Sequence, residues 1–121
     1  MVLLAVVIEA TAVLVLVLTV ALFGPPDPAE ARAYAERVGY WMGPAAGFAL
    51  CLVGGWIVAR PLTVGHVPRG ALLGAMVAVI DVAILMGSGA TFQLILVASN
   101  VGRIVAGSLG GLVARRTDTA E

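Results

Sequence analysis

Residues 91–114 read TFQLILVASNVGRIVAGSLGGLVA, and this stretch decides the fold. It is long enough to cross a bilayer as a helix, since about 20 residues span a hydrocarbon core about 30 Å thick. Arg103 lies near its middle, where a guanidinium costs about 2.5–3.5 kcal/mol on insertion scales. The stretch therefore predicts a membrane helix with a buried charge that needs a partner.

The same stretch carries a small residue at every fourth position. In a helix these residues form a ridge that lets another backbone approach closely. Two earlier segments repeat the pattern, so we expect several helices to pack closely along such ridges. The three predicted ridges are Ala98, Gly102, Ala106, Gly110 and Ala114; Gly43, Gly47, Cys51, Gly55 and Ala59; and Gly70, Gly74 and Ala78.

Three further apolar runs cover residues 2–23, 39–59 and 68–87. Together with 91–114 they predict an all-α, four-helix transmembrane bundle that forms one domain over residues 1–121. The composition agrees, because 61% of residues are hydrophobic and only 12% are charged. A cleaved signal peptide is the alternative for 2–23. The absence of a basic residue before this run, and Glu9 within it, favour a first span instead.

The polar segment after the first span predicts a short amphipathic helix at the membrane interface, over residues 28–38. Gly24-Pro25-Pro26 ends the first helix. Asp27 can cap the next helix, Pro28 suits its first position, and Glu30 follows three residues after the cap. A helix that continues unbroken into the second span is the alternative.

The arginines predict the orientation. Four of them lie on the side of both termini and the 60–69 loop: Arg60, Arg69, Arg115 and Arg116. Two lie on the other side, Arg32 and Arg37. Cytoplasmic segments carry the excess of basic residues, so we expect a cell (inner) membrane protein with both termini cytoplasmic. All seven basic residues are Arg, which favours a bacterial or archaeal source with GC-rich codons.

Four polar or ionisable residues inside the spans are the candidate site: Glu9, Asp81, Asn100 and Arg103. The turn Gly87-Ser88-Gly89-Ala90 makes the last two spans antiparallel neighbours. Side chains tilt toward the N-terminus of their own helix, so Asp81 and Arg103 lean toward each other, and Asn100 can complete a hydrogen-bonded group. This group is either a structural salt bridge or part of a solute or ion path.

Glu9 is expected to stand apart, because its tilt points away from Arg103. A neutral, hydrogen-bonded carboxylic acid without a further role, or one that faces the lipid headgroups, is one interpretation of Glu9. A proton-coupling site, or a contact across a dimer, is the other.

The sequence predicts no enzyme, no cofactor and no metal site. No Ser, His and acid are arranged for nucleophilic catalysis, and His66 has no second His or Cys nearby. The net charge is zero, so we expect no nucleic-acid partner.

The expected partners are the lipid bilayer and either a homo-oligomer or another membrane protein. We expect a helix-packing assembly or accessory membrane subunit. The alternative is a proton-coupled small-solute carrier that works as an oligomer and uses Glu9, Asp81 and Arg103.

Overall fold

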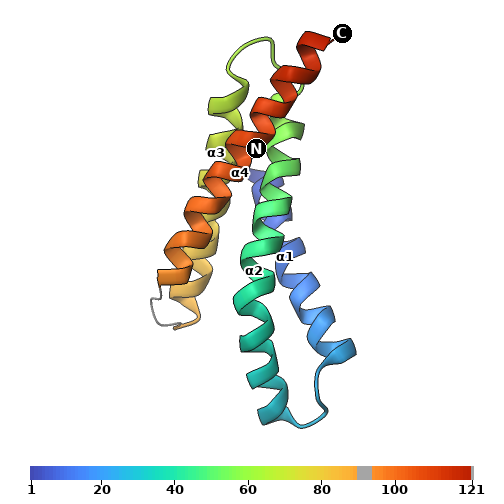
Figure 1. Ribbon diagram of the computed structural model, residues 1–121. Helices are drawn as coiled ribbons and strands as arrows, with labels where there is room; N and C mark the ends of the chain where they lie inside the picture. The colour runs from blue at the N-terminus through green and yellow to red at the C-terminus, as the bar shows by residue number, and fades with distance from the viewer. Residues whose placement is uncertain (90–93, 121) are drawn as a thin grey trace.

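The computed structural model describes residues 1–89 and 94–120, and these residues form four helices without a strand (Figure 1). Each helix is long and apolar enough to cross a membrane. The predicted all-α, four-helix architecture is confirmed. The helices are α1 (Val2–Phe23), α2 (Pro28–Ala59), α3 (His66–Gly87) and α4 (Leu94–Ala120).

The separate short helix expected over residues 28–38 is absent, because those residues are the first turns of α2. The predicted cap is present, since Asp27 Oδ2 accepts a hydrogen bond from the Glu30 backbone N–H at 3.1 Å. Nothing breaks the helix before the second span, and α2 also continues through Pro44. The alternative of one unbroken helix therefore describes this region.

Two other boundaries differ from the sequence prediction. Helix α3 begins at His66 rather than at 68, directly after Gly65, whose φ of 75° lies in the left-handed region that glycine tolerates. Helix α4 continues past 114 to Ala120. Residues 90–93, which include the start of the predicted fourth span, lie outside the described residues.

Helix α4 packs most extensively on α2 and α3, whereas α1 packs on α2 and α3 but, among the described residues, not on α4. Most residues of the predicted ridges lie in these contacts between helices. Their buried members are Gly47, Cys51, Gly55 and Ala59 on α2, Gly70, Gly74 and Ala78 on α3, and Ala106, Gly110 and Ala114 on α4. Gly102 is only half-buried and Ala98 is exposed, so the α4 ridge is used from its middle onward.

A second glycine face on α4, formed by Gly107 and Gly111, was not included in the ridge pattern and makes backbone contacts as close as those of Gly110 in the ridge. A Cβ atom added to Gly55 on α2 or to Gly70 on α3 would overlap the carbonyl oxygen of Gly107. A Cβ atom on Gly111 would overlap the carbonyl oxygen of His66. Only a hydrogen at these positions lets the α4 backbone touch both neighbouring helices.

The bundle is tightly packed toward the end that holds both termini and the 60–65 loop. A buried apolar core joins the helices and includes Ala5, Ile8, Cys51, Leu73, Val77 and Ala106. Toward the other end, the α1–α2 pair and the α3–α4 pair diverge (Figure 1).

Candidate intramembrane binding site

Arg103 on α4 is the centre of a buried charge cluster that contains Glu9, Asp81, Asn100 and Arg103. Only 3% of Arg103 is exposed. Its Nη1 lies 3.0 Å from Asp81 Oδ2 on α3 and 3.4 Å from Glu9 Oε2 on α1. The same nitrogen donates a hydrogen bond to Asn100 Oδ1 at 3.4 Å. The structure therefore brings all four candidate residues together.

The Asp81–Arg103 contact has the geometry that the sequence predicts. Helices α3 and α4 approach closely at this level, because a Cβ atom on Gly74 would overlap the carbonyl oxygen of Arg103. Asn100 is held in place by its own amide, whose Nδ2 donates to the carbonyl oxygen of Leu96 at 2.9 Å. The pair and its neutral partner thus form within one antiparallel helix pair.

The expectation that Glu9 stands apart from Arg103 is wrong, and the reason lies in the packing of α1. Ile8 fills the space above a glycine of α2, where a Cβ atom on Gly54 would lie 2.6 Å from Ile8 Cδ1 and 2.9 Å from Leu73 Cδ2. Burial of Ile8 in this core sets the rotation of α1. Glu9, the next residue, is consequently turned toward Arg103.

The cluster holds more negative than positive charge. Two carboxylates, Glu9 and Asp81, face the single guanidinium of Arg103. Glu9 Oε2 and Arg103 Nε are buried without a hydrogen-bond partner among the described residues. Buried polar atoms in proteins are generally hydrogen-bonded, so an unpartnered acceptor and donor in one cluster is a feature that needs an explanation.

A cavity of about 620 Å³, here called the central cavity, connects this cluster to the surface between the two helix pairs. Glu36 and Tyr40 of α2 are exposed at one end, and Glu9 and Arg103 are buried at the other. The volume is within the range of about 300–1,000 Å³ found for small-molecule sites. Residues from all four helices line it, including Leu16, Gly43, Pro44, Asp81, Leu85, Leu96 and Ser99.

Sequence reasoning missed Glu36 and Tyr40 as part of the site. A signal was present, because these two residues, with Gly43 and Pro44, follow each other at helical spacing on one face of α2. A separate interfacial helix over residues 28–38 places Glu36 on a different element from Tyr40, so the sequence prediction did not put the two on one face. The continuous α2 restores this face.

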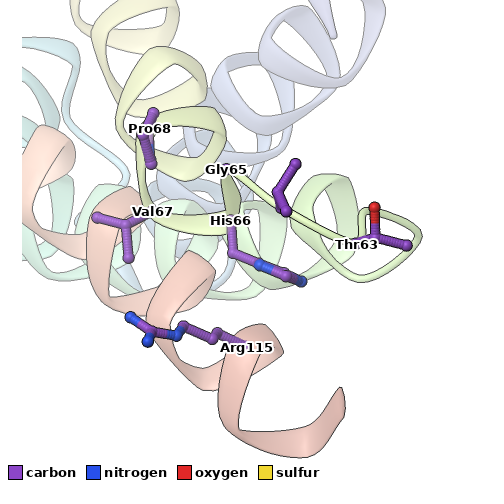
Figure 2. Close-up of a pocket in the computed structure, with 7 residues that line it drawn as sticks. Thr63, Gly65, His66, Val67, Pro68 and Arg115 are labelled. Atoms are coloured by element: carbon purple, nitrogen blue, oxygen red, sulfur yellow. The ribbon is translucent and has the colours of Figure 1, made fainter. Parts of the chain in front are cut away.

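A second cavity, of about 610 Å³, lies at the opposite end of the bundle. It is lined by residues 63–68 and by Arg115, and Figure 2 shows the lining side chains of His66, from the start of α3, and Arg115, from α4. None of the described residues that line it is acidic. Among the described residues, no three His, Cys, Asp or Glu side chains gather as metal ligands. This second cavity therefore differs in charge from the central cavity.

No protein-family model, curated protein or solved structure matches the chain. The side chains of the central cavity, their charges and their depth are thus the basis for a functional proposal.

Gly47 provides the space that Arg103 occupies, which leads to a testable expectation. A Cβ atom at Gly47 would lie 2.5 Å from Arg103 Nε and 2.9 Å from Nη2, so Gly47→Ala must displace the guanidinium. We expect a loss of stability of about 1–3 kcal/mol, measured by unfolding in mixed detergent micelles. In an Arg103→Gln background the same substitution should cost less, since the clash is gone.

Gly43→Ala is the matched control, because a Cβ atom at Gly43, one turn earlier on α2, meets nothing within 4 Å. An equal loss of stability for Gly47→Ala in both backgrounds would show that Gly47 does not act through Arg103.

Proposed function

We propose that this chain is a proton-coupled membrane carrier that binds a small polar solute in the central cavity. The observation that carries the proposal is a cavity that runs from exposed Glu36 to the buried charge cluster, where the carboxylates outnumber the guanidinium. Ionisable residues inside a membrane commonly mark substrate, ion or proton pathways.

The charge balance supports the coupling to protons. Asp81, at 3.0 Å, is the closer acidic partner of Arg103, and Glu9 is the carboxylate in excess. Among the described residues, Glu9 interacts electrostatically with Asp81 on α3, with Arg103 on α4 and with the buried thiol of Cys51 on α2. With both acids ionised the cluster has a net charge of −1, and one added proton makes it neutral. A proton and a positively charged group can therefore alternate at the same place.

The way α1 is attached to the bundle supports a movement of α1 relative to α4. Glu9 and Arg103 form the ion pair that joins α1 to α4 within the described part of the chain, and the backbones of these two helices do not pack together. Protonation of Glu9 removes the attraction in that pair. We propose that α1 then shifts relative to α4 and changes access to the cluster.

The assembly or accessory subunit that the sequence favoured receives less support from the packing. That prediction depended on small-residue ridges as surfaces for another helix. Most members of these ridges are buried between α2, α3 and α4 of the chain itself. We therefore favour the carrier over the assembly subunit as the proposed function. Formation of a homo-oligomer stays a prediction.

We further propose that the chain lies in the cell membrane of a bacterium with both termini in the cytoplasm. The turn between α1 and α2, and the opening of the central cavity, then face outward, with the start of α2 at the membrane interface. Tyr34, in the second turn of α2, supports this placement, because aromatic side chains are enriched at the membrane interface.

Cysteine labelling tests the orientation. In a Cys51→Ala background, Pro26→Cys and Thr63→Cys each place one thiol at an exposed position in a connecting segment. An impermeant thiol reagent applied to intact cells should label Pro26→Cys and spare Thr63→Cys, and permeabilised cells should show labelling of both. Labelling of Thr63→Cys alone in intact cells would reverse the orientation.

A flux assay tests the carrier. The purified protein is reconstituted into liposomes with a trapped pH-sensitive dye, and gradients of a small cation, anion or neutral solute are imposed in turn. We expect one class of solute to move protons, with loss of the signal in Glu9→Gln. Glu30→Gln, an exposed change in the first turn of α2, should keep the signal. No proton movement with any class, together with co-purification of a membrane partner, would favour the assembly subunit instead.

A further inference from the structure

We infer that the solute of the central cavity is a protonated alkylamine, whose ammonium group binds Glu9 and whose alkyl chain lies along the apolar wall. This inference rests on the proposed function and specifies its substrate class. Three properties of the cavity lead to it: its charge, its unsatisfied acceptor and its lining.

The charge of the cavity favours a cation. Its described lining contains three acidic residues, Glu9, Asp81 and Glu36, and one basic residue, Arg103. Arg32 approaches Glu36 at 4.0 Å, but both side chains are largely exposed, so water and salt screen that pair. Near the buried end, Asp81 already compensates Arg103. An anionic solute would meet uncompensated carboxylates along its path, whereas a monovalent cation would neutralise the cluster.

The unsatisfied acceptor distinguishes between classes of cation. Glu9 Oε2 is buried and, although it lies 3.4 Å from Arg103 Nη1 in the ion pair, it accepts no hydrogen bond from the described residues. A primary ammonium group carries N–H donors that can satisfy this oxygen, and charge-assisted hydrogen bonds of this kind are short and strong. A quaternary ammonium group has no N–H and would leave the oxygen unsatisfied.

The aromatic content of the cavity also favours a primary over a quaternary ammonium group. Quaternary ammonium groups are recognised by cages of several aromatic rings. Tyr40 is the one aromatic residue among the described residues that line the cavity, and it lies at the exposed end, away from Glu9. The buried end therefore suits a hydrogen-bonding ammonium better than a methylated one.

The wall between the two ends is apolar. Its side chains come from α1, α3 and α4 and are mostly branched aliphatic groups: Ala12, Val13, Leu16, Ile84, Leu85, Ile95 and Leu96. Such a wall offers few donors or acceptors to a sugar or to a zwitterion. It can cover an alkyl chain, because burial of CH₂ groups away from water is favourable.

Binding measurements on the purified protein in lipid nanodiscs test this inference. The probes are hexylammonium, hexyltrimethylammonium and hexanoate, which share one alkyl chain and differ in the head group. Titration calorimetry, corrected with empty nanodiscs for partition into lipid, should show hexylammonium binding about tenfold or more tightly than hexyltrimethylammonium. Hexanoate should show no binding. Glu9→Gln should weaken hexylammonium binding about tenfold or more, and Glu30→Gln should leave it unchanged.

Equal binding of the two cations, tighter binding of hexanoate, or no binding of any probe would overturn the alkylamine. If Glu9→Gln does not fold, the relative affinities of the three probes for the unmodified protein still test the inference. The proposed carrier fails separately. Hexylammonium binding without proton movement above that of protein-free liposomes would contradict the carrier and keep the amine site. Hexanoate-driven proton movement above that background would keep the carrier and remove the amine.

Discussion

Gly107→Ala is expected to destabilise the bundle by about 3 kcal/mol, at the upper end of the range for overpacked sites. A Cβ atom on Gly107 would overlap the carbonyl oxygen of Gly70, and it would lie 3.1 Å from the Gly70 carbonyl carbon and from the Gly74 nitrogen. These atoms belong to the α3 backbone and cannot rotate away as a side chain can. Helix α4 must therefore separate from α3, and contacts along both helices weaken together.

Gly102→Ala is the matched control on the same helix. The nearest atom to a Cβ at Gly102 is Phe48 Cδ2 at 3.9 Å, which is an ordinary van der Waals distance. Both substitutions add the same methyl group to a helix. The free energy of unfolding, measured for both variants in mixed detergent micelles, should fall for Gly107→Ala and stay the same or rise for Gly102→Ala. Similar values for the two would contradict the close backbone contact.

Arg103→Gln is expected to destabilise the protein by about 3–5 kcal/mol, because loss of one partner strands buried charges. Here the substitution strands two carboxylates, Glu9 and Asp81, instead of one. Arg103→Gln should therefore cost more than either Glu9→Gln or Asp81→Asn. The triple substitution should recover part of the loss, since neutral amides can hydrogen-bond to one another.

Arg37→Gln is the control for the loss of an arginine, because Arg37 is exposed on α2 and surface charges contribute at most about 1 kcal/mol. Unfolding free energies of the single, double and triple variants give the coupling between the three residues. If the losses simply add, the three side chains are not energetically coupled, and the cluster has no joint role.

The sequence by itself determined the four helices and much of the pairing between α3 and α4. Apolar runs of spanning length are a local property, and so is the spacing that places Gly70, Gly74 and Ala78 on one face. Asp81 and Arg103 lie on helices joined by a short connection, which leaves few ways to arrange them. For that reason their contact could be predicted from helical geometry.

Only the tertiary structure decided the place of Glu9 and the existence of the central cavity. The periodicity of a helix says which residues share a face, but not how that helix is rotated against partners distant in sequence. The packing of Ile8 against Leu73 and Gly54 fixes the rotation of α1 and turns Glu9 to Arg103. The cavity likewise depends on how far two helix pairs diverge, which is the combined result of glycine contacts at the opposite end of the bundle.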